Sequence, residues 1–338
     1  MPAVMWGDGR AHPAAIGYSI LGHTQPPRQT PAIAMAEHED LNEQLLTVRD
    51  WLRYAVSRFN AAGLVYGHGT ATALDEAAYL VLHTLHLPMD QLDPWLDARL
   101  LPAERKALQQ IVEKRVSTRK PAPYLTNEAW VGGHAFYVDE RVIVPRSYIG
   151  ELLAGGLAGA VPEPAEVRQV LDLCTGSGCL AILAALAFEN ARVDATEISH
   201  EALAVAERNV RAYGLADRIA LVQADLFEGL SHRRYELILA NPPYVSEASI
   251  AAFPPEYAAE PVVAHAGGRD GLDIVRHILA QAGDRLTPDG TLVVEVGTGR
   301  AVLERDYPTL PFLWLDTAES EGEVFALGAA DLRAGAHG

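Results

Sequence analysis

The sequence predicts an α/β fold, a doubly wound and mostly parallel seven-stranded sheet, preceded by a small N-terminal helical domain. Three observations predict it. Apolar residues recur at helical spacing through residues 36–122. After Glu166, short apolar runs alternate with longer helical segments, as parallel strands and crossover helices do. The last two runs are joined only by "TAESEG", which predicts an antiparallel hairpin at the sheet edge.

The domain boundaries are predicted where this pattern changes. We expect a disordered tail over residues 1–35, a helical domain over 36–122 and a β-hairpin linker over 123–146. An α/β domain is expected over 147–332 and a short tail over 333–338. The first segment is rich in Pro, Gly and Ala and has no sustained period. Its apolar run "AAIGYSILG" is interrupted by Gly and Ser, so we expect no secretory signal and a cytoplasmic protein. An alternative is that Met35 is the true start.

Three segments predict the helical domain. Residues 41–63 place apolar side chains on one face at a period of 3.6, and Gly63 supplies a stop. Residues 75–88 begin with two acidic residues and end at a proline. Residues 102–120 begin with proline and gather Lys and Arg at their C-terminal end, where the helix dipole favours them.

The later elements follow in order. Between Pro123 and Pro145, β-branched and aromatic residues surround Gly132-Gly133, which predicts short antiparallel strands. Seven strands of the α/β domain are predicted at residues 169–174, 192–197, 218–223, 235–240, 291–297, 312–316 and 323–328. Helices are predicted at residues 179–189, 199–214 and 271–286.

Composition and charge limit the classes of partner. The 338 residues are 49% hydrophobic and 21% charged, and no apolar run approaches the roughly 18 residues of a membrane span. The formal net charge of −17 opposes partners held by phosphate neutralisation, such as nucleic acid, and favours a basic protein. Cys174 and Cys179 exclude a disulfide framework. Neither they nor the helical pair His83 and His86 have enough accompanying ligands for a metal site, so we expect none.

Polar residues follow the first three predicted strands of the sheet. A strand leads through Asp172 into Gly176 and Gly178 and then a helix, an arrangement that lets backbone approach a ligand. Glu197 ends the next strand, where a carboxylate can accept both hydroxyls of a ribose. Asp225 follows the third, where an adenine amino group could donate to it. Helix capping is the alternative for each acidic residue, but together they indicate a ligand site at the carboxyl edge of the sheet.

The fourth strand ends in Asn241-Pro242-Pro243-Tyr244, hereafter the tetrad. Such residues also favour a simple turn. With the three acidic strand ends, however, the chain resembles the class I S-adenosylmethionine-dependent methyltransferases, which have a Rossmann-like fold. The "NPPY" pattern is that of members which methylate planar exocyclic nitrogens, either adenine in nucleic acid or glutamine amides. The resemblance implies a methyltransferase domain over 147–332 and S-adenosylmethionine as cofactor.

The resemblance also implies roles for particular residues. Catalytic roles go to Asn241, Pro242 and Tyr244, and Pro243 joins them in binding the substrate. Cofactor binding is implied for Asp172, Thr175, Gly176, Gly178, Glu197, Ile198, Asp225, Leu226 and Asn241. Asn241 can accept one N–H with its side-chain oxygen and Pro242 another with its carbonyl, while the prolines restrict the backbone that presents them. These hydrogen bonds would strengthen as the nitrogen gains its methyl group, which stabilises the transition state. The ring of Tyr244 can pack against the planar amide.

Outside the sheet, the helical domain, the hairpin and "RVIVPRSYIGELL" look like the protein-glutamine N(5)-methyltransferases, as does the later "AEPVVAHAGGRDGLDIVRHIL". The release-factor enzymes of that family typically carry "PRPDTE" and "DLGTGSG". This chain departs from both, with Ser147-Tyr148-Ile149 after Pro145-Arg146 and Cys174 in place of a glycine. The departures match the branch that modifies large-subunit ribosomal protein L three, and an acidic enzyme suits a basic ribosomal protein. The alternatives are a release-factor enzyme and an adenine-N(6) nucleic-acid methyltransferase.

Two further expectations concern substrate binding. The helical domain would bind the protein substrate. Arg146 would help line the entrance to the site, and the alternative is a surface arginine that caps the hairpin.

Overall fold

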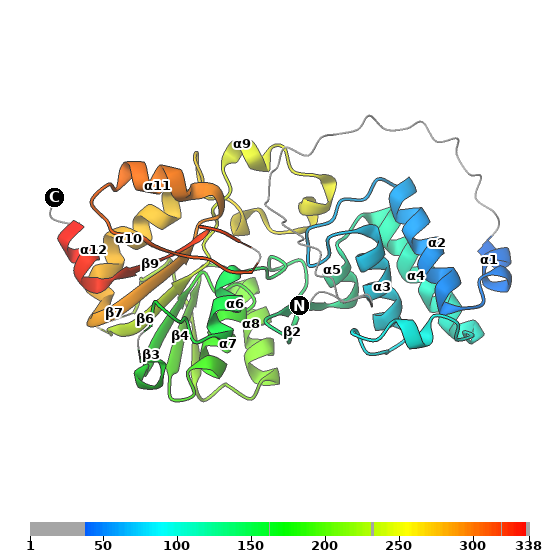
Figure 1. The fold of residues 1–338 in the computed structure, drawn as a ribbon, viewed down its shortest axis with the longest axis horizontal. Helices are drawn as coiled ribbons and strands as arrows, with labels where there is room; N and C mark the ends of the chain where they lie inside the picture. Colours follow the sequence, from blue (N-terminus) through cyan, green and yellow to red (C-terminus); the bar gives the residue numbers. More distant parts are fainter. Residues whose placement is uncertain (1–37, 162, 231–232, 319, 336–338) are drawn as a thin grey trace.

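The computed structural model describes residues 38–161, 163–230, 233–318 and 320–335. A helical part, blue to cyan in Figure 1, lies beside a sheet that is covered by helices on both faces, and a small hairpin lies between them. The predicted tail over residues 1–35 falls outside the described residues. Within those residues, no helix is both long and apolar enough to span a bilayer.

The helical part contains α1 (His38–Gln44), α2 (Val48–Ala61), α3 (Ala73–Thr84), a 3₁₀ turn η1 (Asp93–Trp95), α4 (Pro102–Thr118) and α5 (Ala122–Thr126). The prediction of one continuous helix over residues 41–63 was wrong. Thr47 interrupts it with extended backbone, and its side chain accepts the Asp50 N–H at 3.2 Å while Asp50 accepts the Thr47 N–H at 2.9 Å. This capping box starts a new helix, so apolar spacing continues across a break in the backbone.

A tight core holds these helices together. Trp51, Phe59, Leu80 and Leu108 are almost fully buried between α2, α3 and α4. The same core encloses an ion pair in which Arg115 donates to Glu76 at 2.6 Å.

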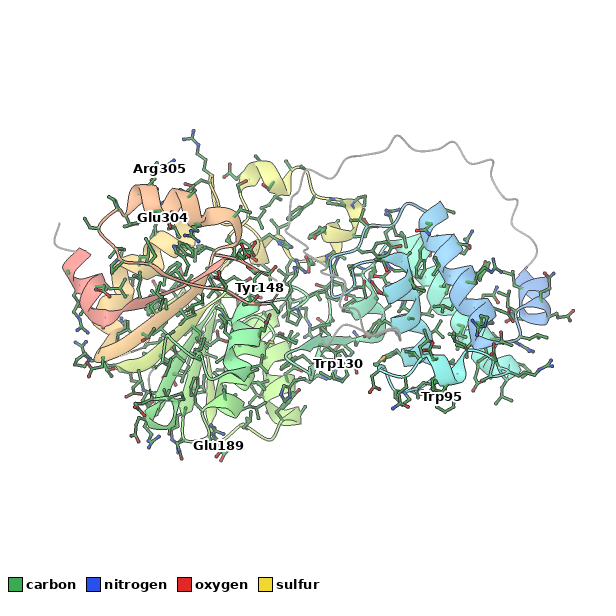
Figure 2. All side chains as sticks on the ribbon, in the orientation of Figure 1. Trp95, Trp130, Tyr148, Glu189, Glu304 and Arg305 are labelled. Carbon is green, nitrogen blue, oxygen red and sulfur yellow. The ribbon has the colours of Figure 1, made fainter. Side chains whose placement is uncertain are left out.

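The linker between the two parts forms the predicted antiparallel hairpin, with β1 (Glu128–Val131) paired to β2 (His134–Tyr137). Trp130 of β1 lies where the helical part and the α/β part meet (Figure 2). A short helix that the sequence pattern did not predict, α6 (Tyr148–Ala154), then leads into the sheet, capped by the side chain of Ser147.

The main sheet has seven strands in the order β5-β4-β3-β6-β7-β9-β8. Their bounds are β3 (Gln169–Leu173), β4 (Arg192–Glu197), β5 (Ile219–Gln223), β6 (Tyr235–Ala240), β7 (Leu286–Glu295), β8 (Leu313–Leu315) and β9 (Val324–Gly328). The first five are parallel, and β9 pairs antiparallel with both β7 and β8. The predicted mostly parallel sheet with an antiparallel edge hairpin is confirmed. The strand order reverses between β3 and β6, and ligands bind at the carboxyl ends beside such a switch point.

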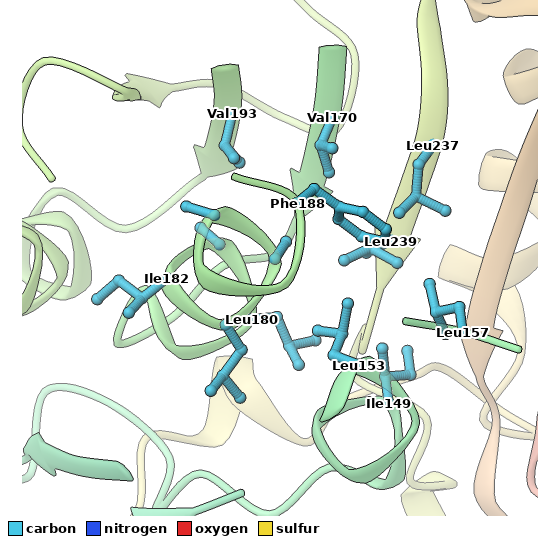
Figure 3. Close-up of a cluster of buried hydrophobic side chains, with 14 of the residues drawn as sticks. Ile149, Leu153, Leu157, Val170, Leu180, Ile182, Phe188, Val193, Leu237 and Leu239 are labelled. Carbon is cyan, nitrogen blue, oxygen red and sulfur yellow. The ribbon is translucent and has the colours of Figure 1, made fainter. Parts of the chain in front are cut away.

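Helices cover both faces of the sheet. On one face, α6 and α7 (Cys179–Ala187) bury apolar side chains near Val170, Leu237 and Leu239 (Figure 3), and α8 (His200–Ala212) packs beside β4 and β5. On the other, α10 (Asp273–Arg285), α11 (Arg300–Asp306) and α12 (Ala329–Gly335) pack against Leu171 and Ile238. The predicted tail from residue 333 therefore begins inside a helix. Arg333 donates to the carbonyls of Gly283 and Leu286 at 2.9 Å, which ties the end of α12 to α10 and the start of β7.

The segment after the tetrad connects the two parts of the molecule. It carries α9 (Glu247–Ile250) and the 3₁₀ turns η3 (Pro255–Ala259) and η4 (Val262–Ala264). Glu256, buried in η3, accepts the Val65 N–H at 3.0 Å and a guanidinium N–H of Arg119 at 2.6 Å. The chain that leaves the tetrad is thereby fixed to the helical part.

Candidate active site

The glycine loop after β3 forms one side of the site. Thr175 donates its hydroxyl to Asp172, and the Gly176 N–H donates to Glu197 at 3.0 Å, so the ends of β3 and β4 are joined directly. Gly176 has a φ of +54°, which favours glycine, and a Cβ built there would meet no atom within 4 Å. The space on the Cβ side of Gly176 is therefore open.

Asp172 lies near the end of β3, and Cys174 directly follows that strand. Burial raises the pKa of Asp172 to about 7, although the hydrogen bond from Thr175 opposes the shift. Burial also raises the pKa of the Cys174 thiol, and the carboxylates of Glu197, Asp172 and Asp225 add to that shift. All three predicted acidic residues thus raise the pKa of the same thiol, directly after β3.

Glu197 and Asp225 differ in their contacts. Glu197 accepts the Ser199 N–H at 3.0 Å as well as that of Gly176, so it organises the backbone at the end of β4. The exposed side chain of Asp225 makes no hydrogen bond to another described residue, so the alternative of helix capping does not apply to it. Ile198, next to Glu197, is 53% exposed, whereas Leu226, next to Asp225, is buried.

The tetrad directly follows β6 at the switch point. The Asn241 amide Nδ2 lies 3.5 Å from the Arg146 carbonyl oxygen. Within the described part of the chain, neither Asn241 Oδ1 nor the Pro242 carbonyl accepts a hydrogen bond. The Tyr244 hydroxyl donates to Glu295 at 3.0 Å. The two acceptors predicted to bind the substrate nitrogen therefore have no donor among the described residues.

Arg146 lies next to the tetrad and is held by a buried carboxylate. Its guanidinium donates to both oxygens of Glu260 at 2.9 Å. His265 and, from the helical part, His68 place Nε2 atoms 2.9 and 3.4 Å from the same carboxylate. Burial alone would raise the pKa of Glu260, but the charge and hydrogen bonds of Arg146, and the two nearby histidines, lower it. Arg146 is thus more than a free surface side chain, and its ion pair lies where the two parts meet.

Sequence reasoning missed Glu295, Ser147 and the role of Glu260. Glu295, the last residue of β7, is 1% exposed and accepts hydrogen bonds from Tyr244, Ser147 and the Tyr148 N–H. A charged residue inside the apolar run "TLVVEVG" was the available signal. Among the described residues, no group of three or more His, Cys, Asp or Glu side chains could hold a metal ion.

Comparisons with known proteins bear on this site. The family model "Methyltransferase small domain" matches residues 154–253. A protein of Bordetella pertussis, named ribosomal protein uL3 glutamine methyltransferase, is 56% identical over 285 residues, which cover 84% of this chain and 96% of that protein. A protein of the same name from Neisseria gonorrhoeae is 53% identical over 285 residues, with coverages of 84% and 95%. This chain belongs to the ribosomal protein uL3 glutamine methyltransferase family.

Family membership confirms the resemblance and the enzyme class drawn from the tetrad. The fold is that of the class I methyltransferases, and S-adenosylmethionine is the methyl donor. Among solved structures, the catalytic domain of hMettl16 in complex with an RNA hairpin matches with a TM-score of 0.45 and 16% identity, covering 71% of this chain and 85% of that one.

Proposed function

We propose that this enzyme transfers a methyl group from S-adenosylmethionine to the side-chain amide nitrogen of a glutamine in ribosomal protein uL3. The observation that carries the proposal is the pair of acceptors without donors, Asn241 Oδ1 and the Pro242 carbonyl, at the end of β6. A primary amide has two N–H donors, which such a pair can accept. The names of relatives at 53–56% identity support uL3 as the substrate and, with it, a cytoplasmic location.

The strand ends β3, β4 and β5 fit the cofactor. S-adenosylmethionine supplies an electrophilic methyl group when it is bound. The open backbone at Gly176 leaves room for it, and Gly178 and Thr175 complete that loop over Asp172. Glu197 would accept the ribose hydroxyls and Asp225 the adenine amino group, with Ile198 and Leu226 beside the base. The free carboxylate of Asp225 supports this assignment.

The tetrad would act on the nitrogen. Delocalisation makes an amide lone pair a poor nucleophile, and the two acceptors would hold that lone pair toward the methyl group. As the new bond forms, the N–H groups become more acidic and their hydrogen bonds to Asn241 and Pro242 strengthen. Pro243 keeps the backbone rigid at this point. The proton can leave after transfer, so no strong base is needed in the site.

The helical domain and the distribution of charge support a protein substrate. Residues 38–122 carry ten Lys and Arg against eleven Asp and Glu, whereas residues 123–338 carry fifteen against thirty-one. The acidity therefore lies almost entirely on the part that includes the catalytic site. A basic ribosomal protein would be attracted there, and the nearly neutral helical domain would contribute shape rather than charge. Arg146 would border the substrate entrance.

The test is methylation in vitro with labelled S-adenosylmethionine. The wild-type enzyme is incubated separately with unmethylated uL3, unmethylated release factor, and DNA or ribosomal RNA. We expect label on uL3, located by mass spectrometry on a glutamine side chain. Label on release factor alone would transfer the substrate assignment to that protein, and label on nucleic acid alone would overturn glutamine as the target.

A further inference from the structure

Glu295 is a buried carboxylate whose partners are all neutral donors. Its Oε1 accepts the Tyr244 hydroxyl at 3.0 Å, and its Oε2 accepts the Ser147 hydroxyl at 2.7 Å and the Tyr148 N–H at 3.0 Å. No Lys, Arg or His among the described residues forms an ion pair with it. Because burying an unpaired carboxylate is costly, its presence calls for a role beyond filling the core.

The three donors come from two segments that border the tetrad. Tyr244 is the last residue of the tetrad. Ser147 and Tyr148 begin α6 directly after Arg146, whose carbonyl lies 3.5 Å from the amide of Asn241, the first residue of the tetrad. Figure 2 shows Tyr148 near the middle of the molecule, beside the sheet. Glu295 therefore bonds to one end of the tetrad and, through residues 146–148, fixes the backbone that contacts its other end.

The ring of Tyr244 is also confined on a second side. Gly297, two residues beyond Glu295, has a φ of +50°, and a Cβ built there would lie 2.8 Å from the Tyr244 ring. That separation is far below a normal contact between carbon atoms. The chain from Glu295 to Gly297 thus holds the hydroxyl by a hydrogen bond and lies against the ring edge, so Tyr244 is in contact with this segment at both its hydroxyl and its ring.

We propose that Glu295 is a positioning residue for methyl transfer. Through Tyr244 and Ser147 it fixes the orientation of the tetrad, so that Asn241 and Pro242 meet the substrate nitrogen in the geometry of the transition state. The inference rests on the proposed function, because it concerns the same acceptor site. It assigns Glu295 an effect on the chemical step, with little effect on cofactor binding.

The first test uses Glu295→Gln, Tyr244→Phe and the double variant. We expect each single variant to lower kcat at least tenfold while KM for S-adenosylmethionine stays within twofold of wild type. The double variant should be no slower than the slower single variant, because both changes act on the same contact between Tyr244 and the side chain at position 295, whose two carboxylate oxygens an amide does not reproduce. The matched control is Tyr235→Phe, which removes the 2.8 Å hydrogen bond of another buried tyrosine to Asp194 in the same sheet and should leave kcat unchanged.

The second test reads the tyrosine without any methyl acceptor. In ¹⁹F spectra of 3-fluorotyrosine-labelled protein, the Tyr244→Phe and Tyr235→Phe variants each identify a signal by its loss. Glu295→Gln should shift or broaden the Tyr244 signal and leave that of Tyr235 in place.

Three outcomes would overturn the proposal: wild-type kcat in Glu295→Gln, multiplicative losses in the double variant, or an unmoved Tyr244 signal. If wild-type enzyme modifies no glutamine, the proposed function fails, and the ¹⁹F result still decides the role of Glu295.

Discussion

Two tyrosine–carboxylate pairs lie along the course of β6, and they are built differently. Tyr235, the first residue of β6, donates to Asp194 at 2.8 Å, and Arg233 donates to both oxygens of that carboxylate at 2.7 Å. Tyr244, four residues beyond the end of β6, donates to Glu295, which receives only a hydroxyl and a backbone N–H besides. Asp194 has a cation partner, whereas Glu295 has none among the residues that the structure describes.

The presence or absence of an arginine partner distinguishes a tyrosine–carboxylate pair that stabilises the sheet from one that we propose serves the active site. Asp194 is paired with Arg233, which offsets the cost of burying its carboxylate, and the pair lies at the end of β6 away from the tetrad. At the carboxyl edge, an unpaired carboxylate is expensive to bury, and Glu295 there accepts a hydrogen bond from Tyr244 of the tetrad, which we propose binds the substrate. We therefore expect changes at the Tyr244 end to affect turnover and changes at the Tyr235 end to affect stability.

The largest expected effect is that of Asn241→Ala. Removing one acceptor should lower kcat on the order of a hundredfold, by analogy with the loss of one oxyanion-hole donor. Cofactor affinity, measured by titration calorimetry, should fall far less than kcat, because the ends of β3, β4 and β5 carry the other proposed cofactor contacts. The matched control is Asn190→Ala, an exposed asparagine just before β4 at the opposite end of the sheet, which should leave turnover unchanged. Equal kcat values for Asn241→Ala and Asn190→Ala would contradict the assignment of catalysis to the carboxyl edge of the sheet.

The cost of burying Glu295 should be visible in the pH dependence of stability. Burial raises its pKa from 4.5 to about 7, although the hydrogen bonds from Ser147, Tyr244 and the Tyr148 N–H oppose the shift and Glu323 adds to it. Between those values the folded state keeps a proton that the unfolded state has lost, so stability falls as pH rises toward 7 and then levels off.

Glu295→Gln has no such proton. The free energy of unfolding of this variant, relative to that of wild type, should therefore rise between pH 5 and pH 8 by on the order of 2 kcal/mol. Urea unfolding at the two pH values measures this difference. If the difference in free energy of unfolding between Glu295→Gln and wild type were the same at pH 5 and pH 8, the Glu295 carboxyl group would be ionised in the folded state at both pH values.

At the other end of β6, Asp194→Ala should affect stability alone. It leaves the buried Tyr235 hydroxyl without its acceptor, which costs about 1–2 kcal/mol. The melting temperature should fall by a few degrees, while kcat at 20 °C stays at the wild-type value. A loss of turnover without a loss of stability would show that this pair also serves the site.

Much of this architecture could be predicted because it rests on local patterns. The seven strands were predicted from segments of five to seven residues, and the tetrad from its position after one of them. The break at Thr47 was missed because a capping box and a continuous helix share the same apolar spacing. Glu295 was missed because its partner Ser147 lies 148 residues away in the sequence, and only the folded sheet brings them together.

The reason why position 174 favours glycine could not be predicted from the sequence, because it depends on the backbone conformation of Cys174. This cysteine stands where release-factor enzymes typically have glycine, and from the sequence alone it indicates only a branch of the family. In the structure Cys174 has a φ of +57°, in the left-handed region that favours glycine. The residue therefore occupies a position that glycine would adopt without strain.

The smallest expected effect is that of Cys174→Gly. Relief of the left-handed strain should stabilise the fold by about 1 kcal/mol, and the greater freedom of glycine in the unfolded chain should take back a similar amount. The net change in the free energy of unfolding should therefore stay below about 1 kcal/mol, with cofactor affinity and kcat preserved. Cys174→Ala keeps the strain and serves as the matched control. A marked loss of cofactor affinity in both variants would mean that the thiol itself contacts the cofactor, so the carboxyl edge would depend on a side chain as well as on the loop backbone.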